Sequence, residues 1–412
     1  MRWIRLCLWG FVLVLSACGA GGNPAPAPSG LSVVAGDTQV TLNWNSEPGV
    51  EYWILYAPGA KVDEKSWSAT TGGNAVVKVQ PPYTLTGLVN GVQYAFAVNA
   101  RVNGGPGGPA SASITVTPRE AGETWAQTTA LGSNTLRAAT YGLLSTAQGY
   151  RMVVAGDAGV VHSSADGSNW TSASLGGSRA VNGMTFATGK VVLVGEGGLV
   201  ATSTDLATYT PVSSGVGVDL HAVASNGSKL LAVGSGGVIL SSTDASSWTA
   251  VSSGVTQDLY SLAYSPDGFW LAVGSAGTVL KSADGVSWKS VSTGAQASWR
   301  SVTTLARTTT VNKVTTTHYQ LVAVGDLGQV ATSTDGENWT RADQSSQVQL
   351  RKVMGSGARF VAIGDAGVIL LSSDGLDWRT LTPITSADLR TLVRFGNVYR
   401  AFGAGGVQLE SR

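Results

Sequence analysis

The residues able to do acid–base or metal chemistry are dispersed along this 412-residue chain. Its three histidines, His162, His221 and His318, lie far apart in the sequence. Both cysteines, Cys7 and Cys18, fall in the first eighteen residues, so no thiol remains downstream for a metal site or a disulfide. We therefore expect no metal, no cofactor and no catalytic residues. Two carboxylates suffice for a glycosidase, however, so that activity stays open.

The clearest recurring side chains are an aspartate in Ser-x-Asp and an aromatic residue four positions later. The six pairs are Asp166/Trp170, Asp205/Tyr209, Asp244/Trp248, Asp284/Trp288, Asp335/Trp339 and Asp374/Trp378. An aspartate at a tight turn accepts backbone N–H groups, and a large aromatic side chain packs well between sheets. We interpret these pairs as structural repeat residues.

The elements that position these side chains repeat with a fixed period. The first glycine of a Gly-x-x-Gly turn recurs at Gly156, Gly195, Gly234, Gly274, Gly325, Gly364 and Gly403. Successive differences are 39, 39, 40, 51, 39 and 39 residues. A period near 40 built only from strands and turns predicts an all-β chain whose main domain is a seven-bladed β-propeller, with four strands in each blade.

Aligning the repeats on this glycine brings a polar set to the start of each innermost strand. The seven aligned residues are Arg137, Asn182, His221, Tyr260, Arg300, Arg351 and Arg390. The Gly-x-x-Gly turns add Asp157, Asp326 and Asp365 in three of the repeats that have an arginine. We predict that both sets lie on one face, at the mouth of the central channel. They form either a ring of ion pairs or a partner-binding patch. In the second case Arg390, which has no acid in its own turn, keeps a guanidinium free for a carboxylate or phosphate.

The propeller is expected to span residues 119–412 and to close on itself. The seventh repeat stops at Arg412 after its third strand, and 124–128 has the pattern of a strand that precedes the first repeat. Pairing between the two removes the exposed sheet edges. The longer fifth repeat contains a Thr-rich stretch, 307–318, which predicts a projecting hairpin on the opposite face. That hairpin is a second candidate for a working surface.

Residues 30–118 have the alternating pattern of a small β-sandwich. The stretch 85–98, with Tyr94 near its centre, resembles the E–F corner of fibronectin type III domains, and Trp44 matches the core tryptophan of that family. The resemblance implies a spacer module ahead of the propeller.

Residues 1–17 resemble a lipoprotein signal peptide, with Arg2 and Arg5 ahead of a short apolar run. Leu15-Ser16-Ala17-Cys18 resembles the lipobox of bacterial lipoproteins, which implies acylation of Cys18. Residues 18–29 would then form a flexible tether. Without Arg2 and Arg5, 24 Lys and Arg face 25 Asp and Glu, a net charge of −1 that gives no support for nucleic-acid binding. We expect an exported, lipid-anchored protein, in the outer membrane of a Gram-negative host.

The Ser-x-Asp repeat resembles the Asp-box of bacterial neuraminidases (the BNR repeat). Its spacing and its Val-Gly-Asp-x-Gly turn are more similar to the propellers of the photosystem II assembly and stability factor family. That resemblance implies a non-enzymatic scaffold or assembly protein that docks its partner through an arginine-rich face. We expect a monomer with an envelope or extracellular protein as its partner. Two alternatives remain: a carbohydrate-active enzyme of sialidase or glycoside hydrolase type, and a surface adhesin with a protein or glycan ligand. The sialidase alternative lacks that family's Arg-Ile-Pro motif.

Overall fold

The computed structural model describes residues 24–145, 148–311, 314–342, 347–395 and 397–411. The leader, Cys18 and most of the tether therefore lie outside the described residues. The chain divides into two compact units, Met1–Arg119 and Glu120–Arg412, and each is described by itself. Within the described ranges, no helix combines the length and the apolar character that crossing a membrane would require.

The first unit is a sandwich of two antiparallel sheets. One sheet contains β1 (Ser32–Gly36), β2 (Gln39–Asn43) and β5 (Tyr83–Thr86), and the other contains β4 (Asn74–Val79), β3 (Val50–Pro58), β6 (Tyr94–Val102) and β7 (Ile114–Val116). Trp44 is buried against Tyr52, with their ring centroids 5.7 Å apart. The Tyr94 hydroxyl accepts the backbone N–H of Val89 at 3.3 Å, which closes the corner expected from the sequence.

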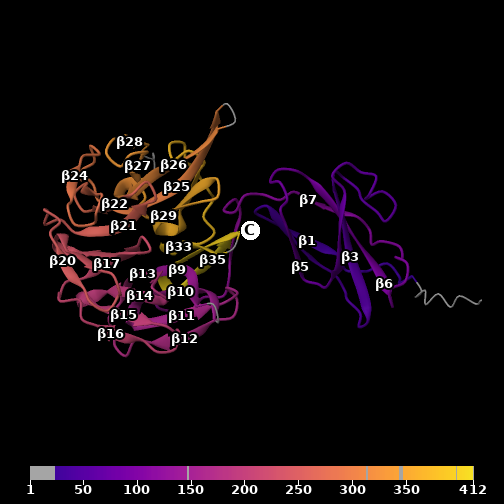
Figure 1. The fold of residues 1–412 in the computed structure, drawn as a ribbon, viewed down its shortest axis with the longest axis horizontal. Helices are drawn as coiled ribbons and strands as arrows, with labels where there is room; N and C mark the ends of the chain where they lie inside the picture. Colours follow the sequence, from indigo (N-terminus) through magenta and orange to yellow (C-terminus); the bar gives the residue numbers. More distant parts are fainter. Residues whose placement is uncertain (1–23, 146–147, 312–313, 343–346, 396, 412) are drawn as a thin grey trace, which may run out of the picture. The chain divides into compact units, whose positions relative to one another are not determined.

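The second unit consists of seven four-stranded antiparallel sheets, the blades of a propeller (Figure 1). The innermost strands are β9 (Leu136–Ser145), β13 (Val181–Ala187), β17 (Leu220–Ser225), β21 (Leu259–Ser265), β25 (Trp299–Val311), β29 (Leu350–Ser356) and β33 (Leu389–Phe395). The second strands are β10 (Gly149–Gly156), β14 (Lys190–Gly195), β18 (Leu230–Gly234), β22 (Phe269–Gly274), β26 (Val314–Gly325), β30 (Arg359–Gly364) and β34 (Val398–Gly403).

The two outer strands of each blade are shorter. The third strands are β11 (Val160–Ser164), β15 (Val200–Ser203), β19 (Ile239–Ser242), β23 (Val279–Ser282), β27 (Val330–Ser333), β31 (Ile369–Ser372) and β35 (Gln408–Ser411). The fourth strands are β12 (Thr171–Ser174), β16 (Thr210–Val212), β20 (Thr249–Val251), β24 (Lys289–Val291), β28 (Thr340–Arg341), β32 (Arg379–Thr380) and, in the last blade, β8 (Trp125–Gln127).

Hydrophobic side chains between adjacent blades hold the ring together. The second strand of each blade is packed on both faces, and for this reason it is a continuous apolar run such as Val191–Val194, which is fully buried. One such interface joins Leu271 of β22 to Trp299 and Leu321 of the next blade. The propeller core is therefore a circle of interfaces between blades, and each blade depends on both of its neighbours.

The repeated aspartates stabilise the turn between the third and fourth strands. Asp335 accepts the backbone N–H groups of Glu337 and Asn338, each at 2.8 Å, and these bonds hold the pKa of its carboxyl well below the usual range. The same pair of backbone bonds is made by Asp166, Asp205, Asp244, Asp284 and Asp374.

The repeated aromatic residues pack in the interface between their own blade and the preceding one. Trp170 of blade one meets Phe402 of blade seven edge-on, with the ring centroids 6.1 Å apart. Around the ring, the equivalent interfaces contain Tyr209, Trp248, Trp288, Trp339 and Trp378. All six rings are only partly buried, so they cover the outer part of each interface.

The polar atoms of these aromatic residues differ from blade to blade. Trp339 Nε1 donates to the Gly336 carbonyl at 3.2 Å, and Trp378 Nε1 donates to the Gly375 carbonyl at 3.1 Å. The buried Nε1 atoms of Trp248 and Trp288, by contrast, have no hydrogen-bond partner among the described residues. The shared role of the repeated aromatic residue is therefore to pack its side chain between two blades. The hydrogen bond from the indole Nε1 is made in some blades and not in others.

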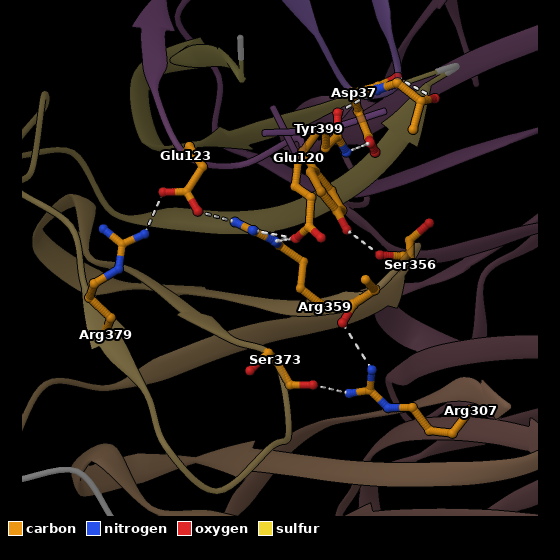
Figure 2. Close-up of polar contacts among 12 residues, drawn as sticks. Asp37, Glu120, Glu123, Arg307, Ser356, Arg359, Ser373, Arg379 and Tyr399 are labelled. Atoms are coloured by element: carbon orange, nitrogen blue, oxygen red, sulfur yellow. Dashed lines mark hydrogen bonds and ion pairs between the residues drawn. The ribbon is translucent and has the colours of Figure 1, made fainter. Parts of the chain in front are cut away.

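The N-terminal strand of the propeller closes the ring. β8 pairs antiparallel with β35, in the register Leu409↔Gln127, Glu410↔Ala126 and Ser411↔Trp125. This pairing confirms the seven-bladed closure predicted from the sequence. The segment before β8 is also held on blade six, because the Arg359 guanidinium contacts the carboxylates of both Glu120 and Glu123 (Figure 2).

The long fifth repeat forms an extended hairpin. The pairing of β25 and β26 continues outward as far as Val311↔Val314, and the hairpin projects beyond the rest of its blade (Figure 1). Near its base, Arg307 Nη1 donates to the Ala358 carbonyl at 2.9 Å and its Nη2 contacts the Ser373 carbonyl (Figure 2). Blade six therefore supports the base of the hairpin.

Candidate functional site

A β-bulge occurs at the same place in all seven innermost strands. In blade six, Leu350 pairs with Gly364 and Lys352 pairs with Ile363, which leaves Arg351 as the extra residue. Equivalent register shifts occur in the other six blades. A bulge bends its strand and changes the direction of the extra side chain. The bulges therefore direct one side chain from each blade toward the centre of the ring.

These side chains surround an open cavity of about 380 Å³, called the channel mouth below. Its lining residues are Thr135, Arg137, Asn182, His221, Tyr260, Arg300, Arg351 and Arg390. All seven residues aligned in the sequence are among them. The four arginines belong to blades one, five, six and seven, which are consecutive in a closed ring. We call Arg137, Arg300, Arg351 and Arg390 the arginine arc.

The repeated aspartate and aromatic pairs lie away from this cavity. They occupy the turns between the outer strands, and the residues lining the channel mouth come instead from the starts of the innermost strands. Among the described residues, the mouth therefore includes none of Trp170, Tyr209, Trp248, Trp288, Trp339 and Trp378, and none of their paired aspartates. The structure thus separates the residues that build the blades from those that form the candidate site.

Carboxylates of the Gly-x-x-Gly turns orient the arginine arc. Arg300 donates from Nε and Nη2 to the two oxygens of Asp326, each at 2.7 Å. Arg351 makes the same two-pronged contact with Asp365, at 2.8 and 2.7 Å. These contacts raise the pKa of Arg300 and lower the pKa of the Asp365 carboxyl. In blade one, Arg137 Nε donates to Asp157 at 2.6 Å.

Arg390 is not the free guanidinium that the sequence predicts. Its Nη2 donates to Asp388 at 2.8 Å, and its Nη1 lies 3.7 Å from Asp365 of blade six. The prediction was wrong because it considered only acids in the Gly-x-x-Gly turns, where blade seven has Ala404. The partner instead lies two residues before Arg390, across the bulge on the same chain segment.

The arginines remain able to bind a ligand despite these ion pairs. Arg300 and Arg351 bond to the acids through Nε and Nη2, which leaves other N–H groups of each guanidinium outside these ion pairs, and Arg300 also contacts Tyr260. Their side chains keep 26% and 22% exposure, and both line the channel mouth. A guanidinium fixed by an acid in this way presents its remaining N–H groups with little loss of conformational entropy.

The other side of the mouth is built from neutral and acidic groups. His221 Nε2 lies 3.0 Å from the Ser235 hydroxyl, and burial lowers the pKa of this histidine. The Tyr260 ring packs between His221 and the guanidinium of Arg300, which is 4.4 Å from its centroid. Asp219 and Asp258 each accept a backbone N–H of the preceding blade's turn at 2.8 Å. The mouth is therefore electrostatically asymmetric, with its cations concentrated in the arginine arc.

The sequence analysis missed three acids that lie beside the residues lining the mouth, namely Asp219, Asp258 and Asp388. They share one position, immediately before the first residue of the innermost strand, and Asp388 likewise accepts the N–H of Ala366 at 3.0 Å. A comparison of the repeats extended two positions upstream of the aligned column would have found all three.

The Gly-x-x-Gly turns pack closely on neighbouring backbone around the mouth. A Cβ on Gly234 would lie 2.2 Å from the Asp219 carbonyl oxygen, so this turn packs directly on the start of the innermost strand. Gly237 has φ +74°, and a Cβ there would lie 2.1 Å from the Val255 carbonyl oxygen. Both glycines are needed for close backbone packing and, at Gly237, for a left-handed conformation.

The arrangement is suited to binding. Within the described ranges, no three His, Cys, Asp or Glu side chains are grouped as metal ligands. The arginine arc offers planar N–H donors around a cavity, a geometry that matches carboxylates and other oxyanions.

Comparisons with known proteins agree with this architecture. Residues 26–117 match the fibronectin type III domain. No curated protein matches the chain. Among solved structures, YCF48 bound to D1 peptide is similar with a TM-score of 0.55 and 16% identity, over 71% of this chain and 96% of that one.

Two further structures share the propeller fold. YCF48 from Cyanidioschyzon merolae has a TM-score of 0.54 at 17% identity, over 70% of this chain and 98% of its own. The WD40 β-propeller domain of Doa1 has a TM-score of 0.53 at 9% identity, over 70% of this chain and 95% of its own. At these identities the likeness concerns the fold alone.

Proposed function

We propose that this protein is a non-enzymatic scaffold of the cell envelope, whose propeller binds a polypeptide partner at the channel mouth. The arginine arc carries the proposal, because the bulges and the acids hold four guanidinium groups around one open cavity. The fibronectin type III domain would act as a spacer, and an acylated Cys18 would anchor the chain to the membrane.

Two features favour a polypeptide partner. Arginine and aromatic side chains are enriched where proteins bind one another, and the mouth places Tyr260 beside Arg300. One structure of similar fold, YCF48, is bound to a peptide. A rigid ring with a polar mouth presents these side chains at little entropic cost on binding.

The test is affinity capture of envelope proteins with the full chain and two variants. The mouth variant combines R300A, D326A, R351A and D365A, so that no acid is left behind without its cation. The control variant combines K281A and E337A, which removes an ion pair outside the channel mouth. A partner captured by the native chain and by the control, and lost at least tenfold with the mouth variant, is expected.

Equal capture by all three proteins would contradict the mouth as the docking face and favour the hairpin of β25 and β26 or the fibronectin type III domain. Turnover of a glycan by the native chain would instead support the carbohydrate-active alternative. Both variants must keep the native melting temperature within a few degrees for the comparison to be valid.

A further inference from the structure

A second, inner cavity of about 140 Å³ continues from the channel mouth into the ring. It shares all seven aligned mouth residues and is lined in addition by residues one step further along the innermost strands. In chain order, the lining residues that follow the aligned positions are Ala138, Gly183, Ala222, Ser261, Lys352 and Thr391, and Ser301 holds the same position in blade five without being a lining residue. Six of these side chains are small. Lys352 is the one charged side chain in this layer.

Two hydroxyls of this layer accept backbone N–H groups from the innermost strand of the next blade. The Ser261 hydroxyl accepts the N–H of Val302, and the Ser301 hydroxyl accepts the N–H of Val353, at 3.3 and 3.2 Å. Lys352 occupies the same position in blade six. Its amine has no acceptor lone pair to offer while it is protonated, so it cannot replace the hydroxyl in this role. Bonding to the next blade, the role of the serines at this position, therefore does not explain the lysine in blade six.

Lys352 differs from the other lysines of the propeller that the structure describes. Lys190 and Lys229 reach backbone carbonyls of the next blade, and Lys281 and Lys289 contact Glu337. Lys352 makes no hydrogen bond or ion pair with any described residue. Asp326, Asp365 and Asp388 are already paired with arginines of the arc, and Asp219 and Asp258 accept backbone N–H groups instead. Among the described cations that line the inner cavity, Lys352 is therefore the one without a carboxylate partner.

The enclosure of this amine makes an anion a favourable neighbour. Burial lowers the pKa of Lys352, because the protein replaces water around the ammonium without supplying a counter-charge. An anion in the inner cavity would supply that charge. A ligand with one negative charge fits best, because the four arginines already have carboxylate partners and only the Lys352 ammonium lacks one. A second negative charge on the ligand would have no counter-charge in the cavity.

We propose that the inner cavity binds a carboxylate group, held by the Lys352 ammonium beneath the arginine arc. Ser261 and Thr391 line the same cavity, and the Ser261 hydroxyl, which accepts from Val302, has its proton free to donate to the ligand. The cavity volume suits a group of a few heavy atoms, because a water molecule occupies about 30 Å³ in the liquid. This inference rests on the proposed function, because it assumes that the partner docks at the channel mouth. It adds the chemical group, a carboxylate, that is recognised there.

The test follows the Cε resonance of Lys352 by NMR in the full chain labelled with ¹³C at lysine Cε. K352M identifies the signal, and K289M serves as the control, since Lys289 has a 75% exposed side chain. The probes are acetate and a blocked pentapeptide with one central glutamate. A carboxylate beside the ammonium is expected to raise the pKa of Lys352 by about one to three units and to leave the other lysines unchanged.

A shift with acetate supports a site open to free small carboxylates. A shift with the peptide alone supports a site filled by an acidic side chain of a docked polypeptide. If neither probe at saturating concentration shifts the signal, or if phosphate shifts it as far as acetate does, the proposal is overturned. A null result here, together with partner capture that still depends on the arginine arc, would remove this inference and leave the proposed function intact.

Discussion

Replacing the closing strand should open the propeller, and the structure allows the cost to be worked out. The perturbation is the exchange of Trp125–Gln127 for Gly-Ser-Gly, which keeps the chain length. β8 contributes three residue pairs to β35. The Trp125 ring packs on Tyr399, with centroids 6.5 Å apart. Ladder pairing over three residues at about 1 kcal/mol each and a half-buried tryptophan at about 2 kcal/mol give a loss of about 5 kcal/mol.

The matched control is the same exchange at Thr210–Val212. This segment, β16, is also an outermost strand with three ladder pairs, but it lies inside the continuous chain of blade two and does not close the ring. Thr210 and Pro211 are exposed, so little apolar packing is lost. We expect a cost of about 2 kcal/mol for the control.

Calorimetry of the full chain measures both variants, with the melting transition of the fibronectin type III domain as an internal standard. At about 2–4 °C per kcal/mol for a domain near this size, the closure variant should lower the propeller transition by about 10–20 °C, and the control by less than half as much. The reasoning fails if the two variants melt within about 2 °C of each other.

Three further predictions concern single residues. E410A leaves the Arg400 guanidinium, whose side chain is 5% exposed, without its carboxylate partner, and should lower the free energy of unfolding in denaturant by about 3 kcal/mol. E337A, which breaks a more exposed ion pair, should lower it by at most about 1 kcal/mol. Equal losses for the two variants would contradict this. The pKa of Asp335 is lower in the folded than in the unfolded chain, so its contribution to stability is complete above about pH 5 and is lost as the pH falls through the folded pKa. D335A should accordingly melt below the native chain at pH 7 and approach it under strongly acidic conditions, and a gap that does not change with pH would refute this account. C18S should release the protein from membranes in cell fractionation, and continued co-sedimentation with lipid would defeat the proposed anchor.

The repeat architecture could be predicted because each blade meets the same constraints. Gly234 and its equivalents pack against a carbonyl oxygen, and Asp335 and its equivalents close the same turn, so both leave a fixed period in the sequence. The alignment of one column also predicted which side chains share the channel mouth. The missing fourth strand of the last blade predicted the closure by β8 for a similar reason, since an unpaired edge has to be covered.

The contacts made by individual side chains at the channel mouth could not be predicted, because they depend on the β-bulges, which the spacing of residues in the sequence does not reveal. The bulge takes Arg390 out of the regular ladder, and Asp388, which precedes β33, lies within 2.8 Å of its guanidinium. Lys352 was missed because the residue after an aligned arginine would face away from it in a regular strand. The same bulge allows Arg351 and Lys352 to line one cavity.

The central claim is that a polypeptide binds at the channel mouth, and site-specific photo-crosslinking in cells tests it most directly. A photoreactive residue at Gln296 or Ser386, both exposed on loops that lead into the arginine arc, reports on the mouth. The same residue at Ser228, exposed in the hairpin between β17 and β18, reports on the opposite face. The account predicts one crosslinked protein partner from Gln296 and Ser386 and none from Ser228. Crosslinking from Ser228 with none from the two mouth positions would contradict it.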